Sequence, residues 1–270
     1  MLFSELPLNI IFIRLFRTMM NEVQQKKTKK FFGSIACDNQ EKWGFAEAVG
    51  KRLIEKLGVN DSDVEEWRIF NAQIGEIPDE KDIEKFDGFT ISGSAASVNG
   101  NAEWLKKLEK FIQQAAEREN GPRIAGVCFG HQMICKALGG TVGNNPSSKF
   151  VIQTEKIHAN EEMKKRFYFE EVYNKSPLNL VQSHGECILE LPRGAVSLAR
   201  SPTCEHEVVE FSKHIVGVQS HPEMYPKEAV EKIVPYVTNS DEEMSEASDS
   251  FAKPVDSNTM IEALRLFLHS

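Results

Sequence analysis

The chain has 270 residues, of which 41% are hydrophobic and 27% are charged, values that are ordinary for a globular enzyme. Its formal net charge of -8 argues against a nucleic-acid-binding protein, because no strongly basic face remains once the acidic residues are counted. The cysteines are odd in number and contain no C-x-x-C pair, so we expect a reducing, cytoplasmic environment, no disulfide framework and no metal.

The N-terminal segment, residues 1–30, precedes the first predicted strand. Its apolar run Leu6–Phe16 is interrupted by Arg14 and is too short to span a bilayer. A mitochondrial presequence, a short docking helix and a rarely used upstream start ahead of Met19 or Met20 are the three interpretations, and we favour the last. We therefore expect this segment to be disordered or dispensable.

The first half of the remaining chain alternates short apolar runs with stretches of helical periodicity. The expected strands are Phe31–Ala36, Val64–Ile69, Gly88–Ser92 and Arg123–Val127, and the expected helices are Lys42–Leu57, Trp104–Arg118 and Gly130–Leu138. Alternating strands and helices are typical of a parallel sheet covered on both faces.

The second half consists mainly of short strands separated by loops. They are expected at Phe150–Ile157, Leu178–Ser183, Val196–Ala199, Val208–Phe211 and Ile215–Gln219, with a helix at Lys227–Val237. The fold class predicted is α/β: a doubly wound, mostly parallel open sheet flanked by helices (flavodoxin-like), with a smaller antiparallel β layer in the second half.

The last part of the chain divides at residue 260. Residues 238–259 are rich in Ser, Asp and Glu and lack apolar periodicity, so we expect a flexible acidic loop. Residues 260–270 have the pattern of an amphipathic helix that docks back onto the domain formed by residues 31–237.

The strongest chemical signal is the segment Gly126–Gln132, with the sequence GVCFGHQ. A buried strand ends here, Cys128 lies between flanking glycines, and a helix begins, which is the pattern of a nucleophile elbow with cysteine in place of serine. The helix N-terminus favours the thiolate form of the cysteine, and the Phe129 amide is placed to donate to an oxyanion. A buried structural cysteine at a strand–helix junction is the alternative.

A cysteine nucleophile needs a histidine base, and the base needs a group that fixes its tautomer. His221 follows an apolar strand directly, and Glu223 projects to the same side of a locally extended chain. His184 is the competing candidate, although a role in lining the site suits it better. Ahead of these residues, the strand that ends near Ser92 leads into Gly93 and Ser94, whose amides are candidates for a second oxyanion donor.

The segments Ile91–Ser94, Gly126–Gln132 and Gly217–Glu223 together resemble the class I glutamine amidotransferase domain, with similarity from about Phe31 to about Val237. The resemblance implies that Cys128 forms a γ-glutamyl thioester, that His221 shuttles the proton and that Glu223 orients it. It also implies that the Ser94 and Phe129 amides bind the oxyanion. Gly93, Gln132 and His184 are the residues expected to contact the substrate. No cofactor is implied.

Among the branches of this family, the free-standing chain looks most like the γ-glutamyl peptidases. The first hypothesis is therefore a hydrolase of γ-glutamyl amide or peptide bonds, acting on a small molecule such as glutamine or a glutathione-like compound, with no nucleic-acid or membrane partner. The second is a glutaminase subunit that delivers ammonia to a separate synthetase. The third is a non-catalytic binding protein that retains the fold.

Overall fold

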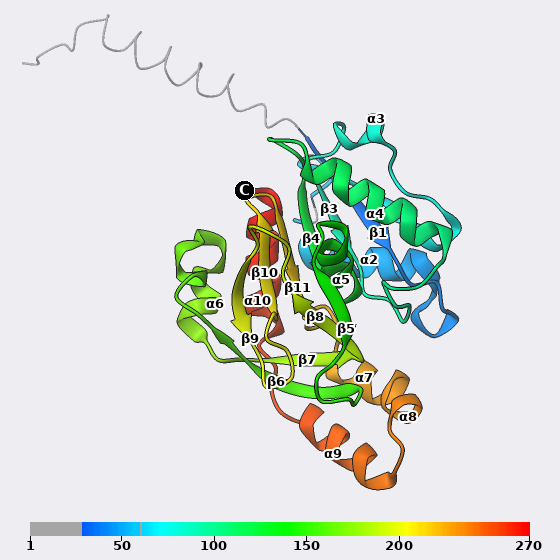
Figure 1. Cartoon of the computed structure of the whole chain (residues 1–270), viewed down its shortest axis with the longest axis vertical. Helices are drawn as coiled ribbons and strands as arrows, with labels where there is room; N and C mark the ends of the chain where they lie inside the picture. The colour runs from blue at the N-terminus through cyan, green and yellow to red at the C-terminus, as the bar shows by residue number, and fades with distance from the viewer. Residues whose placement is uncertain (1–28, 60) are drawn as a thin grey trace, which may run out of the picture.

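The computed structural model describes residues 29–59 and 61–270, so the expectation for residues 1–30 falls almost entirely outside the described chain. A nine-stranded sheet forms the centre of this part of the molecule, in the order β2-β1-β3-β4-β11-β10-β9-β6-β7 (Figure 1). Its strands are β1 Lys30–Ala36, β2 Glu65–Asn71, β3 Gly88–Ile91, β4 Arg123–Val127, β6 Val151–Ala159, β7 Leu178–His184, β9 Val196–Arg200, β10 Val208–Ser212 and β11 Ile215–Val218.

The sheet has a parallel and an antiparallel half. The strands from β2 through β1, β3 and β4 to β11 are all parallel, whereas β11, β10, β9, β6 and β7 pair antiparallel. A separate antiparallel pair joins β5 (Thr141–Asn144) to β8 (Glu186–Glu190). The predicted α/β fold class is confirmed, with parallel strands in the first half of the chain and antiparallel strands in the second half. Most of the antiparallel strands continue the same sheet, and only β5 and β8 form a separate pair.

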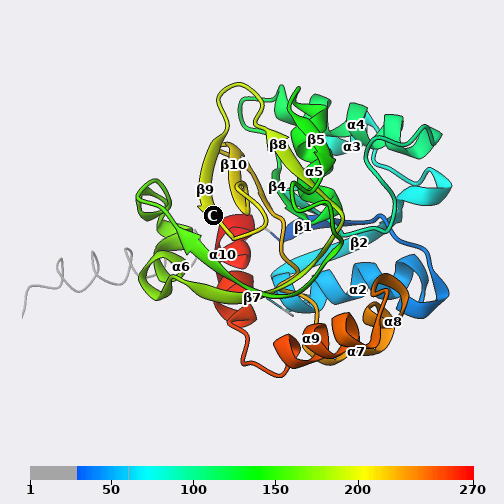
Figure 2. The same cartoon turned by 60° about the horizontal axis from the view of Figure 1, so that its bottom comes forward.

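Helices cover both faces of the sheet, as Figure 2 shows. They are α2 Phe45–Leu57, α3 Glu80–Ile83, α4 Glu103–Ala116, α5 Phe129–Ala137, α6 Glu170–Lys175, α7 Pro226–Lys232, α8 Val234–Val237, α9 Asp241–Phe251 and α10 Ser257–His269. Single 3-10 turns are η1 Glu41–Trp43, η2 Ala72–Ile74, η3 Met163–Lys165 and η4 Phe167–Phe169. One core packs α3, α4 and α5 on one face, and a second packs α2 and α10 on the other.

The C-terminal helix α10 docks back as expected. It begins three residues earlier than predicted, and Met260, Leu264 and Phe267 are fully buried in the same core as Leu53 of α2. Within the described residues, no helix combines the length and apolar character needed to cross a membrane.

The expectation of a flexible loop over residues 238–259 is wrong for its middle part, which forms helix α9. The Ser240 side chain accepts a hydrogen bond from the Glu243 amide, and three acidic residues in the first turn favourably oppose the helix dipole. On the inner side, Ala247 and Phe251 are buried. The sparse apolar residues at positions 247 and 251 are spaced four apart, so one side of the helix is apolar.

Two predicted helices are interrupted. The expected helix Lys42–Leu57 is split at Gly44, which has φ +76° and separates η1 from α2. The expected helix Lys227–Val237 is split at Ile233 into α7 and α8, because Pro235 carries no N–H to continue the hydrogen-bonding pattern. Together α7, α8 and α9 form a third small core with Ile152 and Val181 at the antiparallel end of the sheet.

Candidate active site

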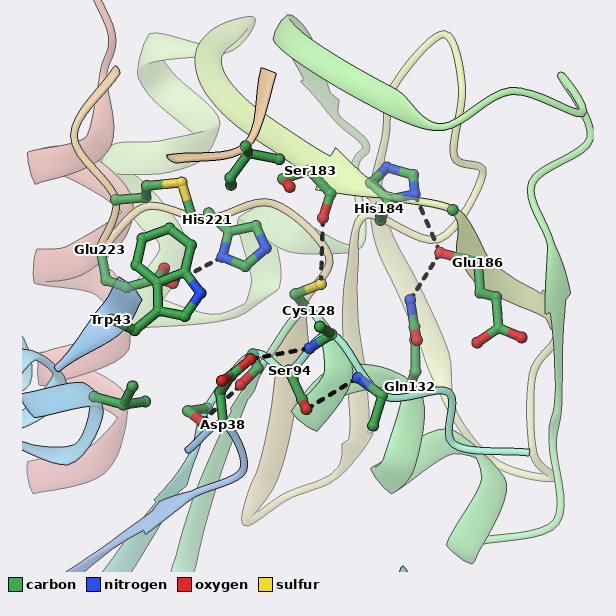
Figure 3. A pocket seen from close by; sticks show the side chains of 18 of the residues that line it. Asp38, Trp43, Ser94, Cys128, Gln132, Ser183, His184, Glu186, His221 and Glu223 are labelled. Carbon is green, nitrogen blue, oxygen red and sulfur yellow. Dashed lines mark hydrogen bonds and ion pairs between the residues drawn. The ribbon is translucent and has the colours of Figure 1, made fainter. Parts of the chain in front are cut away.

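A cavity of about 490 Å³ opens at the carboxyl ends of the parallel strands, where α/β folds bind ligands. Its lining includes all but one of the residues that the sequence singled out: Gly93, Ser94, Cys128, Gln132, His184, His221 and Glu223. Figure 3 shows side chains of this set gathered around the Cys128 sulfur. Phe129 is the exception, since its ring packs at 5.5 Å from Trp104 in the core and only its backbone faces the elbow.

Cys128 has the strained backbone that an elbow requires. Its φ is +49° and its ψ is -102°, and α5 begins at the next residue. The flanking glycines are required by space: an added Cβ at Gly130 would lie 2.3 Å from the Ile91 carbonyl oxygen, and one at Gly126 would lie 2.6 Å from the Ile134 side chain. The predicted turn geometry is therefore confirmed, and it holds the thiol at the helix N-terminus.

His221 and Glu223 form a buried pair directly after β11. The imidazole Nδ1 lies 2.8 Å from Glu223 Oε1, which leaves Nε2 as the nitrogen available to the sulfur. Burial alone lowers the pKa of His221, but the Cys128 sulfur and the Glu223 carboxylate outweigh burial, so that the pKa is held well above its usual value. Both β4 and β11 end at this point, with Val127 paired to Val218. The register of these strands brings the thiol and the imidazole together.

The loop after β3 lies against the same two side chains. A Cβ built at Gly93 would be 2.9 Å from His221 Cε1 and 3.8 Å from Cys128 Cβ, so only glycine fits without displacing the imidazole. Within the described residues, the backbone amides of Ser94 and Phe129 donate to no other group. Both amides are therefore free to donate to a ligand oxygen.

Gln132 and His184 lie on the wall of the cavity next to β8. Gln132 Nε2 donates to the Glu186 carbonyl oxygen at 2.7 Å, and His184 Nδ1 lies 3.1 Å from that same oxygen. Burial and the nearby charge of His221 lower the pKa of His184 to about 4, so this imidazole is neutral near pH 7. Its Nε2 has no partner within the described residues, and this suits a wall residue better than a base.

Three residues of the site were missed by the sequence analysis. The buried Asp38 carboxylate, at the end of β1, accepts a hydrogen bond from the Ala95 amide at 3.1 Å and so holds the loop after β3. Gln219 Nε2 lies 3.5 Å from the Cys128 sulfur. Trp43 of η1 lines the cavity on the Glu223 side. Two of these residues could have been found from the sequence. Asp38 follows the carboxyl end of a predicted parallel strand, and Gln219 lies two residues before His221.

The arrangement suits acyl transfer. A thiol at a helix N-terminus, an imidazole and a carboxylate can act as nucleophile, general base and orienting group, and two free amides can bind the oxyanion that forms. The sulfur also lies 3.7 Å from the Ser183 carbonyl oxygen, which can accept a hydrogen bond from the S–H group whenever Cys128 is a thiol.

Comparison with known proteins identifies relatives over most of the described chain. The family model for class-I glutamine amidotransferases matches residues 46–236. Gamma-glutamyl peptidase 3 of Arabidopsis thaliana is 35% identical over 175 residues, which cover 65% of this chain and 69% of that protein. One of the subunits of the glutamine-hydrolyzing GMP synthase of Pyrococcus abyssi is 32% identical over 159 residues, covering 58% of this chain and 80% of that protein.

A solved structure has the same fold. A glutamine amidotransferase from Thermotoga maritima superimposes with a TM-score of 0.66 over 90% of this chain and 100% of that chain, at 17% sequence identity. At this low identity the likeness concerns the arrangement of the elements and not the substrate.

Proposed function

Because the chain belongs to the class-I glutamine amidotransferase family, we propose that it is a cysteine hydrolase that cleaves γ-glutamyl amide or peptide bonds through a thioester on Cys128. The observation that carries the proposal is the assembly of Cys128, His221 and Glu223 in one cavity beside two free amides. The γ-glutamyl peptidases of Arabidopsis among the relatives support the choice of bond.

In the proposed reaction, the thiol proton of Cys128 has already passed to His221 Nε2, whose raised pKa favours holding it, and the Cys128 sulfur attacks the γ-carbonyl carbon of the substrate. The Ser94 and Phe129 amides stabilise the oxyanion that forms. The C–N bond then breaks, and His221 returns the proton to the leaving nitrogen, which gives a γ-glutamyl thioester and a free amine. In the second half, His221 deprotonates a water molecule that attacks the thioester, and glutamate and the thiol are released.

The substrate carbonyl is placed by the cavity walls in this proposal. Gly93 allows the substrate backbone to approach the sulfur, and Gln132 and His184 line the side that receives the γ-glutamyl group. Glu223 fixes the His221 tautomer with the Nδ1 proton toward its carboxylate, so that Nε2 faces the reacting atoms. The buried thiols also fit a reducing compartment, and we propose a cytoplasmic location.

The test compares purified wild type with Cys128→Ala, offering glutamine, glutathione and a γ-glutamyl dipeptide separately and measuring released glutamate. We expect release by the wild type and a loss of at least about 10⁴-fold in the variant. Wild-type protein that releases no glutamate from any of the three compounds contradicts the proposal.

A second function is favoured by one observation, the similarity to a single component of a glutamine-hydrolyzing GMP synthase. In this alternative the same thioester chemistry delivers ammonia to a partner synthetase. It predicts that only glutamine is hydrolysed and that hydrolysis accelerates when the partner binds.

A further inference from the structure

The cavity extends to both sides of the Cys128 sulfur. Figure 3 shows Gln132 and Glu186 on one side, and His221, Glu223 and Trp43 on the other. At about 490 Å³ the cavity falls in the range of roughly 300–1,000 Å³ that accommodates drug-sized ligands. The γ-glutamyl group therefore need not fill it, and the two sides can bind different parts of a substrate.

Proton transfer decides which part binds on which side, if the function proposed above is correct. His221 must hand its proton to the leaving nitrogen, so the leaving group has to depart on the side of His221. The γ-glutamyl group then lies on the opposite side, against Gln132. Trp43 consequently borders the leaving group and not the acyl group.

The leaving-group side is lined by apolar side chains from three separate segments. Trp43 comes from η1 and Met224 from the turn that follows β11. Ile233 lies between α7 and α8, and Val237 is the last residue of α8. Trp43 packs against the small core that contains Met224 and Ile233. Ammonia, the leaving group of glutamine, makes no use of such a surface, whereas the side chains and backbone of a peptide can pack on it.

Two cations also line this side, but only one of them is paired with a carboxylate. The Arg52 guanidinium holds Glu228 with both of its terminal nitrogens, at 3.0 and 2.7 Å. Lys42 makes no ion pair within residues 29–59 and 61–270. Its ammonium lies 5.6 Å from the Trp43 ring centre and 5.3 Å from that of Tyr236, and donates to the Lys232 carbonyl oxygen at 3.5 Å.

A cation that lines a cavity and is held by aromatic rings, with no carboxylate paired to it within the described residues, is available to an anionic ligand. The carboxylate of a peptide leaving group is the anion that the proposed reaction would bring to this position. We propose that Lys42 and Trp43 form a leaving-group site, in which Trp43 packs on the peptide and Lys42 pairs with its terminal carboxylate.

The test measures binding, so that it does not depend on turnover. Calorimetry would compare γ-glutamylalanylglycine with its C-terminal amide on the full-length Cys128→Ala protein. We expect the acid to bind about fivefold more tightly than the amide, the upper end for a largely exposed ion pair. This preference should disappear in Cys128→Ala/Lys42→Ala and should persist in Cys128→Ala/Lys42→Arg, which keeps the charge.

Lys106→Ala in the same background is the matched control, because Lys106 is an exposed α4 lysine outside the cavity and its loss changes the net charge equally. Three results would each overturn the leaving-group site. They are equal affinities for the acid and the amide, no binding of either peptide, and a preference for the acid that survives Lys42→Ala. Glutamate release by wild type is judged separately: release without an acid preference rejects only this site, and an acid preference without release rejects only the proposed function.

Discussion

The side-chain amide of Gln219 lies 3.5 Å from the Cys128 sulfur, to which its Nε2 donates. The other end of the same amide accepts a hydrogen bond from Gln132 at 3.0 Å, and both side chains are buried. The amide thus has a fixed orientation, with its positive end toward the sulfur. Such a donor stabilises the negative charge that the sulfur carries when it acts as a nucleophile.

Replacing Gln219 by Glu should slow the chemistry of Cys128. A carboxylate at this distance repels a thiolate by roughly 1–4 kcal/mol between the limits for water and for a protein surface. We expect alkylation of Cys128 by iodoacetamide at pH 7 to fall by at least about tenfold. Gln219→Met, which removes the donor without adding charge, should have a smaller effect. Equal rates in wild type and Gln219→Glu would contradict this role of the amide.

Glu223→Gln should lower the pKa of His221. In the native protein that pKa is raised, against the opposing effect of burial, by the sulfur and by the Glu223 carboxylate, and the variant removes one of the two anions. Loss of an opposite charge at this distance changes a pKa by roughly 1–3 units, so the imidazolium should be lost at lower pH. NMR titration of the His221 ring is the measurement. Glu231→Gln, a substitution of a largely exposed carboxylate on α7, serves as control and should leave the titration unchanged.

Gly93→Ala should impair catalysis without unfolding the protein. The added methyl group would lie 2.9 Å from His221 Cε1 and would push the buried imidazole away from the sulfur. A misplacement near 1 Å costs roughly 100-fold in rate, so we expect kcat to fall by at least about tenfold while Tm changes little. Gly100→Ala adds the same methyl group in a loop outside the cavity and is the control. Full activity in Gly93→Ala would show that the imidazole can be accommodated elsewhere.

Glu207, fully buried behind the active site, should make the fold less stable as the pH rises. Burial raises the pKa of its carboxyl to about 7 from an ordinary value of 4.5, and Glu155 nearby adds to the effect. Because the folded-state pKa is the higher one, the stabilisation is complete below the unfolded-state value and is lost as pH rises through about 7. At 1.36 kcal/mol per pKa unit the loss is about 3 kcal/mol.

The isosteric variant Glu207→Gln tests this pH dependence, because the new side chain can still accept the hydrogen bond that Gln182 donates to Glu207 at 2.9 Å. Urea unfolding at pH 5 and pH 8 should show wild type losing about 2.5 kcal/mol more than the variant between the two values, because part of the loss has already occurred at pH 5. Parallel losses in the two proteins would mean that Glu207 is ionised in the fold throughout this range.

Phe267→Ala should destabilise the protein by about 3–5 kcal/mol, although the family match ends at residue 236. The ring is fully buried and packs edge-on against Tyr168 with the ring centres 5.1 Å apart. Its neighbour Leu266 is 45% exposed, so Leu266→Ala should cost much less. Denaturant unfolding of the two variants makes the comparison, and equal costs would contradict the docking of α10 on the core.

The sequence predicted those parts of the site that depend on local patterns. Cys128 between two glycines, and His221 followed two residues later by Glu223, are short-range features, and the structure brings these residues together. Lys42–Trp43 could not be recognised in the same way. Their place in the cavity depends on α7 and α8, which lie some 190 residues further along the chain and contact Lys42 through the Lys232 carbonyl.

The distinction between local patterns and long-range contacts also explains which strands and helices could be predicted. Short, continuous runs of apolar residues predicted the strands of the parallel half, because both faces of these strands are buried. Helix α9 has few apolar residues, and part of its stabilisation comes from a distant strand: Ser250 accepts a hydrogen bond from the Thr154 amide and its carbonyl accepts one from the Thr154 hydroxyl. Local composition does not contain that contact.

The pairing of β4 with β11 joins segments that are about 90 residues apart in the chain, with Val127 opposite Val218. The thiol follows one of these paired residues directly, and the imidazole follows the other after two further residues. During refolding, a chain that has formed β1 to β4 but has not yet added β11 would contain the proposed nucleophile, Cys128, without the proposed base, His221. Because such long-range pairing is slow to form, recovery of the proposed hydrolase activity would report the closure of this strand pair and not the earlier collapse of the N-terminal half.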